Sequence, residues 1–505
     1  MTSVSRLHRV DALELEALRA PRRDLLIEEQ TAIDRWVQIE GPFAVYGRTL
    51  SVGPIGPDAR HDVTEVTEFK LAIPLWGSLF RPMMKRALAD RDRRPRARWW
   101  WGQEVIPAQT TLLLSVVAII SMVVGYLGVI IGQTITFATR EFGADDADQG
   151  WTLAAVRIGV LLSVVLLRFA DRVGRKPLLI WFTVISVAFT AAGAFSTSML
   201  TLGISQAVAR GLATGLLTLV TLAATEEVPA AIRSRSIGLI TLATGLGASM
   251  VVWVLPVSDL AINGWRIVYL LPLLSLPVLW WASRTLPETR RFDAATSHHA
   301  PAKVNRKWFL LLAVTAFASA LFLSPSSQFM NQYLSEELSY SASDISIFRL
   351  LVFSPIAIFV LGAGFLADRI GRRPVAAVGL AFGATASAAV YYSEGARLWI
   401  SAMAGGWLLT AAYTAMRGYQ TELFPTKARA KVGGWLDGIA VTGSALGLII
   451  AGELSSQWGR LGPGITILLV GPLVVLALVV IAFPETARLE LEAFNSDDPP
   501  LPQPG

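Results

Sequence analysis

The sequence predicts an all-α membrane protein, with twelve transmembrane helices in two six-helix bundles and a small α+β cytoplasmic N-terminal extension. Hydrophobic residues make up 53% of the 505 residues and charged residues only 16%, which is too apolar for a surface that faces water throughout. From Thr110 onward, apolar runs long enough to span a membrane recur along the chain. Short charged motifs recur in its two halves, which indicates a duplicated unit.

Residues 1–98 form the predicted N-terminal extension. Residues 12–20 and 78–89 have the pattern of short helices, and residues 43–52 and 63–72 alternate like strands. The basic run at 91–98 follows, and then three tryptophans. Basic residues and tryptophans beside a first span are typical of an anionic membrane surface, so we do not expect nucleic-acid binding.

Twelve apolar segments follow. They are predicted at 109–138, 150–168, 177–196, 199–225, 236–258, 264–284, 307–335, 343–366, 374–393, 396–424, 431–456 and 461–483. Residues 105–284 and 307–487 would then be the two bundles, joined by a cytoplasmic loop at 285–306. The acidic, proline-rich tail at 488–505 is predicted to be disordered.

The basic residues between the spans predict the orientation. Loops after even-numbered spans carry eighteen Lys or Arg, and loops after odd-numbered spans carry four. Because positive loops stay in the cytoplasm, we expect both termini to be cytoplasmic in a multi-pass protein of the plasma (inner) membrane.

Three motifs occur twice, each time 196 or 197 residues apart. The first pairs Asp171-Arg172-Val173-Gly174-Arg175 with Asp368-Arg369-Ile370-Gly371-Arg372. The second pairs Glu226 and Arg233 with Glu422 and Arg429, and the third pairs Pro287-Glu288-Thr289 with Pro484-Glu485-Thr486. Three repeats in register indicate duplication of a six-span unit, and transporters are often built from such halves.

With these motifs, the chain from about residue 105 to 487 resembles the major facilitator superfamily. Within it, the pattern is similar to the sugar porter, metabolite symporter and organic-ion transporter groups, although Leu167 replaces a glycine in the first loop motif. The resemblance implies alternating access. Contacts between charged groups at the cytoplasmic ends would favour the outward-open state, and their separation would release it. The expected switch residues are Asp171, Arg172, Arg175, Glu226, Arg233, Glu288, Asp368, Arg369, Arg372, Glu422, Arg429 and Glu485.

Ionisable residues inside spans are costly and therefore mark candidate sites. Arg210 lies in the middle of the fourth span, where the resemblance places a functional arginine. Arg417 and Asp437 have matched depths in the tenth and eleventh spans, which predicts an ion pair. Arg157 and Arg349 are expected nearer the outer side, where they either snorkel or attract an anion.

Uncharged polar residues complete the predicted substrate site. Gln133 lies in the first span, Gln328 and Asn331 in the seventh, and Trp407 in the tenth. The tenth span lacks the sugar-porter signature, so a hexose is disfavoured. Arginines outnumber carboxylates within the spans, which favours an organic anion such as a carboxylate.

Several chemistries are excluded by what the sequence lacks. It has no cysteine, none of its four histidines lies in an apolar run, and it has no phosphate-binding loop. We therefore expect no enzyme activity, no metal and no cofactor.

The predicted function is transport of a small organic metabolite, with protons as a possible partner through Asp437 or Glu453, by a protein that works as a monomer. The alternatives are a non-transporting sensor or scaffold, and a drug exporter.

Overall fold

The computed structural model describes residues 1–55, 60–74, 76–89, 105–163, 175–227, 230–285, 305–424 and 426–485. The predicted switch residues Asp171, Arg172 and Glu288 lie outside this part of the chain, as do the predicted tail and nearly all of the central loop.

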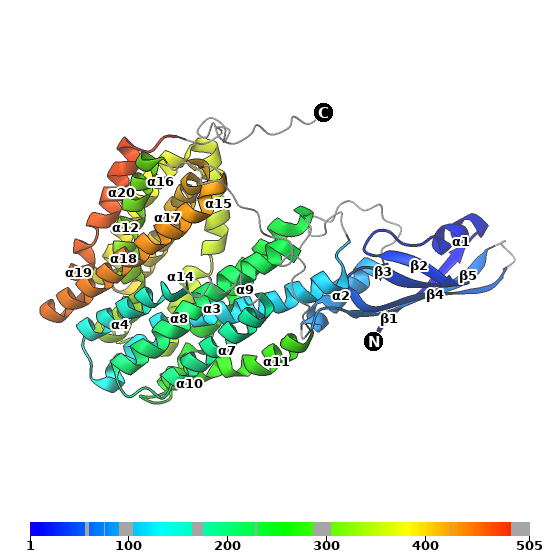
Figure 1. Cartoon of the computed structure of the whole chain (residues 1–505), viewed down its shortest axis with the longest axis horizontal. Helices are drawn as coiled ribbons and strands as arrows, with labels where there is room; N and C mark the ends of the chain where they lie inside the picture. The colour runs from blue at the N-terminus through cyan, green and yellow to red at the C-terminus, as the bar shows by residue number, and fades with distance from the viewer. Residues whose placement is uncertain are drawn as a thin grey trace.

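The N-terminal segment contains a five-stranded antiparallel sheet in the order β1-β5-β4-β3-β2. The strands are β1 (Thr2–Val10), β2 (Ile27–Ala32), β3 (Arg35–Glu40), β4 (Phe43–Ile55) and β5 (His61–Leu71). Two helices pack against the sheet: α1 (Ala12–Arg19), which begins with a capping box at Asp11, and α2 (Gly77–Ala89). Figure 1 shows this unit beyond the end of the long helix α3.

A buried ion pair lies inside this unit. Arg48 on β4 donates to Glu28 on β2 from Nη2 over 2.7 Å and from Nε over 2.9 Å, and both side chains are inaccessible to solvent. Tyr46 donates to the same carboxylate over 2.6 Å, and Arg48 lies 3.9 Å from the centre of the Trp36 ring. Burial and the charge of Glu28 raise the pKa of Tyr46 above its ordinary value. The pair is thus fully hydrogen-bonded, as a buried charge requires.

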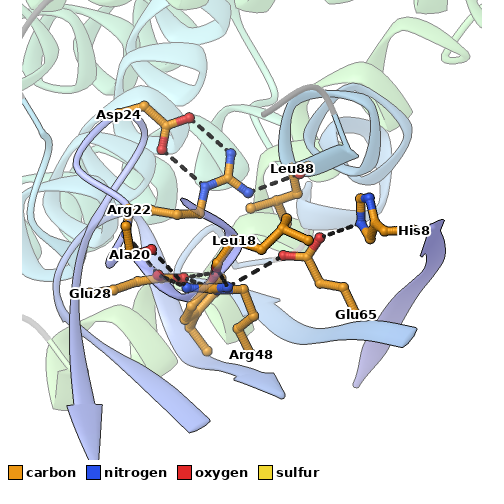
Figure 2. A network of polar contacts seen from close by, with 10 residues as sticks. His8, Leu18, Ala20, Arg22, Asp24, Glu28, Arg48, Glu65 and Leu88 are labelled. Atoms are coloured by element: carbon orange, nitrogen blue, oxygen red, sulfur yellow. Dashed lines mark hydrogen bonds and ion pairs between the residues drawn. The ribbon is translucent and has the colours of Figure 1, made fainter. Parts of the chain in front are cut away.

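Further polar contacts extend this network to β1 and α2, as Figure 2 shows. Glu65 lies 3.7 Å from Arg48 and 3.0 Å from His8. Arg22 forms an ion pair with Asp24 and donates to the carbonyl of Leu88 at the end of α2. These contacts join the sheet to α2.

The rest of the described chain is helical. The helices of the first half are α3 (Ala108–Phe142), α4 (Asp146–Gly159), α7 (Arg175–Gly193), α8 (Met199–Glu227), α9 (Ala230–Val254), α10 (Trp265–Leu270) and α11 (Leu276–Thr285), with the 3-10 turns η1 (Leu255–Asp259) and η2 (Leu271–Ser275). The helices of the second half are α12 (Arg306–Gln328), α13 (Met330–Gln332), the π-helical η4 (Tyr333–Glu337), α14 (Ala342–Phe353), α15 (Ile356–Ile370), α16 (Arg372–Ala389), the 3-10 turn η5 (Val390–Tyr392), α17 (Gly395–Glu422), α18 (Thr426–Trp458), α19 (Leu461–Ile467) and α20 (Val470–Ile481).

The helices form two groups that meet at one end. In the first group α3 packs on α8 and α9, and α7 on α8; in the second, α12 packs on α18 and α20, and α16 on α17. The groups touch through α4 with α18 and through α14 with α9 and η1. Figure 1 shows them diverging from that end, which we call the closed end; the opposite end is the open end.

Seven helices in the described residues are long and apolar enough to cross a membrane. They include all of α3 and the stretches Arg306–Glu337 and Leu461–Ile481, and two shorter apolar helices lie at Pro177–Gly193 and Trp265–Trp281. The fold is therefore mostly helical with several candidate spans. The count of twelve remains a prediction.

Candidate functional site

A cavity of about 590 Å³ opens on the inner side of the second group of helices. Its walls come mainly from α12, α17 and α18, with single residues of α14, α15 and α16, and most of the lining side chains are apolar, including Leu323, Phe353 and Ile356. This volume is in the range of small-molecule sites.

Three hydroxyl side chains line the cavity without being satisfied. Thr315 and Ser319 lie one turn apart on α12, and Tyr413 faces Ser319 from α17. Their hydroxyl oxygens are buried, yet none makes a hydrogen bond of ordinary geometry with a residue that the structure describes. By contrast, Thr410 and Thr414 donate to carbonyls of their own helix. Unpaired buried hydroxyls are uncommon in proteins, and those that line a cavity are available to a polar group of a bound molecule.

Two arginines from the first group of helices lie close together. Arg157 on α4 and Arg210 on α8 are both partly buried, and their guanidinium groups repel each other. Neither makes a hydrogen bond or an ion pair with any residue in the part of the chain that the structure describes. Two like charges in a protein interior are costly, and a bound anion relieves that cost.

A chain of polar contacts connects the two groups. Arg349 on α14 donates from Nε to Asn331 over 2.8 Å and from Nη2 to the carbonyl of Ser327 over 3.1 Å. The amide of Asn331 donates to the side chain of Gln133 over 3.1 Å and to its carbonyl over 2.9 Å. Asn331 and Arg349 are buried. Arg349 is therefore held inside the protein, and the alternative in which it snorkels to the surface is wrong.

The other predicted substrate residues lie around this chain and the cavity. Gln328 covers Gly132, since a Cβ on that glycine would lie 1.9 Å from the Gln328 side-chain oxygen. Trp407 donates to the carbonyl of Val352 over 3.0 Å and stacks on Phe359 with ring centres 4.1 Å apart. These contacts hold Gln328 at the junction of the two groups and Trp407 in the second group, behind the cavity wall.

The predicted ion pair between Arg417 and Asp437 is wrong. The two groups attract each other, but no nitrogen–oxygen distance between them falls within 4.0 Å. Arg417 lines the cavity and both side chains are exposed. Equal depth on neighbouring helices thus placed the residues near each other without directing their side chains together.

The closed end is held by polar contacts between α4 and the second group. Asp146 accepts hydrogen bonds from Gln332 and Ser455. Gln332 also donates to Glu336 over 3.0 Å, and Trp151 donates to Glu453 over 2.8 Å. The backbones meet at Gly150 and Gly452, where a Cβ would lie 2.6 Å and 2.5 Å from a carbonyl oxygen of the other helix. Only glycine allows that approach.

A second set of contacts at the closed end joins η1 to α14. Asp259 accepts from the backbone N–H groups of Ala342 and Ser343 over 2.7 Å and 2.8 Å, and from the Ser343 hydroxyl over 2.7 Å. Ser346 donates to the carbonyl of Val252 over 2.7 Å. A carboxylate of one group therefore caps a helix of the other.

The second loop motif forms the turn between α15 and α16. Glu485 accepts from the backbone N–H groups of Arg372 over 2.9 Å and Arg373 over 3.1 Å. Gly371 between the helices has a φ of +109°, a backbone conformation that residues other than glycine rarely adopt. The structure thus joins two predicted switch motifs. The side chains of Arg175, Glu226, Arg233, Asp368, Glu422 and Arg429 lie outside the described part, whereas Arg369 is exposed.

Known proteins match this arrangement. The sequence profile of the Major Facilitator Superfamily matches residues 113–330 and 312–499. The chain belongs to the major facilitator superfamily. The predicted family is thus confirmed, and this superfamily member is a multi-pass membrane protein that transports a small molecule and is not an enzyme.

Two curated relatives of this superfamily member are transporters. It is 26% identical over 451 residues to a gallate transporter of Pseudomonas putida, covering 77% of this chain and 93% of the relative. It is 25% identical over 370 residues to a cis,cis-muconate transport protein of Acinetobacter baylyi, covering 67% of this chain and 86% of the relative.

Solved structures share the superfamily fold. The inward open conformation of the xylose transporter XylE from E. coli matches with a TM-score of 0.61 at 16% identity, over 77% of this chain and 99% of that one. The nucleoside transporter NupG matches with a TM-score of 0.62 at 14% identity, over 74% and 100%. At these identities the likeness concerns the fold alone.

Proposed function

We propose that this transporter carries a small organic anion, of the carboxylate class, by alternating access. The observation that carries the proposal is the pair formed by Arg157 and Arg210, two interior guanidinium groups with no ion-pair partner among the described residues. A carboxylate between them would offset their repulsion and accept charge-assisted hydrogen bonds from both.

The cavity of the second group and the relatives support this proposal. The cavity of the second group is mostly apolar, which suits the carbon skeleton of an organic acid. The relatives are named for gallate and for muconate, and both compounds are carboxylates. The polar chain of Gln133, Asn331 and Arg349 lies between the groups, where alternating access places the substrate.

We further propose twelve spans, two bundles at 105–284 and 307–487, and cytoplasmic termini in the plasma membrane. The distribution of Lys and Arg supports this orientation. The closed end, where Asp145 and Asp146 lie in the loop after the first span, would then be the outer end. In this orientation the structure is inward-facing. Contacts between the repeated charge motifs would hold the present open end shut in the outward-facing state.

Proton coupling is the final part of the proposal. Asp437 is exposed near Arg417, and Glu453 accepts from Trp151 across the closed end. Each carboxylate would gain or lose neighbours as the protein changes state, which is what coupling requires. We propose that the monomer is the working unit, since each chain supplies both halves of the site.

Binding of carboxylates to the purified protein, with uptake into proteoliposomes as a second readout, tests the anion proposal. Arg210→Gln and Arg157→Gln should each lower carboxylate binding at least about tenfold, because each removes a charge-assisted interaction. Arg210→Lys, which keeps the charge, should restore part of it. Arg397→Gln, at an exposed arginine, is the matched control. Binding of aromatic and aliphatic acids that is equal in Arg210→Gln and the parent protein contradicts the proposal.

A further inference from the structure

A second cavity lies where the N-terminal unit meets the helical body. It has a volume of about 670 Å³, and its walls are almost entirely apolar. Leu71 at the end of β5, with Ile73 and Pro74 just after it, lines one side of the cavity. Leu112 of α3, with Val278 and Trp281 of α11, lines the other side. None of its lining residues lines the cavity of the second group, and the proposed transport mechanism does not use it.

The surroundings of this cavity resemble a membrane surface on one side. α3 is long and apolar enough to cross a membrane, and Trp281 ends the apolar stretch Trp265–Trp281, a position typical of an interfacial tryptophan. Lys70 contributes to the cavity wall, and its side chain is exposed. An apolar space with a cationic rim at the end of a span has the chemistry of a phospholipid site.

Helix α2, which follows directly, extends this surface. Trp76, Leu79, Phe80 and Met83 have the spacing of one helical face, and 37–69% of each is exposed. Arg81, Lys85 and Arg86 are exposed on the rest of the helix. Helices with exposed apolar and basic side chains bind anionic membrane surfaces. The sequence continues with the basic run at 91–98.

We propose that the junction cavity binds an anionic phospholipid, with an acyl chain between the β5–α2 segment and α3 and α11, and the phosphate near Lys70. The lipid fastens the N-terminal unit to the membrane surface, and α2 lies against the headgroups. An uncharged lipid satisfies the apolar walls but leaves Lys70 and the basic residues of α2 without counter-charges, so the site prefers the anionic headgroup.

Native mass spectrometry of the delipidated full chain tests the proposal with phosphatidylglycerol, phosphatidylcholine and a free fatty acid as probes. We expect one retained phosphatidylglycerol per chain and weaker retention of the other two. Val278→Trp fills the cavity and should abolish retention, whereas Leu274→Trp, at an exposed position outside the lining, should not. Lys70→Glu should weaken phosphatidylglycerol binding about tenfold, whereas Arg35→Glu, on an exposed part of β3, should leave it unchanged.

A second measurement does not depend on retention after purification. The chain has no cysteine, so a nitroxide at Ile73→Cys in liposomes reports only on the junction. With anionic lipid, its accessibility to oxygen should rise and its accessibility to a water-soluble nickel reagent should fall; a label at Leu13→Cys on α1 should remain water-accessible. Equal lipid retention by Val278→Trp and the parent protein, equal binding of the two phospholipids, or a water-exposed label at Ile73 overturns the proposal.

Discussion

At the scale of single residues, the neighbours of each guanidinium group distinguish two uses of arginine. Arg48 is held by Glu28, and Arg266 binds Glu141 over 2.8 Å and the carbonyl of Ala194 over 2.6 Å. These arginines are structural, since every charge has its counter-charge. Arg210 has no such partner in the described protein, and the anion proposal is built on that contrast.

The Arg48–Glu28 pair gives a stability prediction. Glu28→Gln removes the carboxylate that binds the buried Arg48 guanidinium directly and leaves only Glu65 at 3.7 Å, so the N-terminal unit should lose about 3–5 kcal/mol of unfolding free energy. Chemical denaturation of the full chain, followed by a fluorophore on a single introduced cysteine in β3, measures the loss. Glu29→Gln, at an exposed neighbour on β2, is the matched control. Equal denaturation midpoints for the two variants contradict the structural role of the pair.

At the scale of elements, the turn between α15 and α16 shows how the repeated motifs work together. Gly371 supplies a backbone conformation with positive φ, and this directs two N–H groups toward Glu485. A Cβ at Gly371 would lie 2.7 Å from Glu485 Oε2. The loop motif and the Pro-Glu-Thr motif are therefore two parts of one contact.

Gly371→Ala should break this contact. The strained backbone costs about 1–3 kcal/mol, and the new methyl group displaces the Glu485 carboxylate. Transport rates corrected for expression should fall more than substrate affinity, because we propose that this turn acts in the conformational cycle. Gly362→Ala in α15, where a Cβ would meet open space, should transport normally. A Gly371→Ala protein with an unchanged maximal rate argues against a switch at this turn.

Sequence patterns predicted some elements well and missed others for a physical reason. The strands expected at 43–52 and 63–72 lie within β4 and β5, and the helices expected at 12–20 and 78–89 match α1 and α2. β1 and β2 were missed because their partly or fully buried side chains include His8 and Glu28, whereas Leu7 faces outward with 74% of its surface exposed. Hydrophobic alternation cannot identify a strand whose buried face is charged.

At the scale of the whole molecule, the state of the transporter depends on contacts between residues far apart in the chain. Asp259 caps α14 from the other group, and Asp146 binds residues 186 and 309 positions away. Such pairs leave no local sequence pattern. Sequence reasoning found Gln133, Asn331 and Arg210 because polar groups in apolar runs stand out, but it could not show which of them touch.

Asp259→Asn should destabilise the closed end. It removes the charge that caps α14, a contribution of about 1 kcal/mol, while the amide oxygen still accepts one hydrogen bond. The population open at this end should rise about fivefold. Distances between spin labels at Leu260→Cys and Ile347→Cys, both exposed positions near the contact, measure the shift.

Asp148→Asn is the matched control, because Asp148 is exposed and its own side chain makes no contact across this end. An unchanged distance distribution in Asp259→Asn shows that the cap does not set the equilibrium.

The glycine contact between α4 and α18 also has a mechanical consequence. Gly452 lies near one end of α18, so the stretch back to Thr426 forms a lever arm of about 40 Å at 1.5 Å per residue. A rotation of about 15°, typical of rigid-body transitions, moves the far end of that arm by about 10 Å. Because the two glycines bring the helix backbones into direct contact, we expect the halves to tilt about this point. A small displacement at the closed end thus becomes a wide opening at the other.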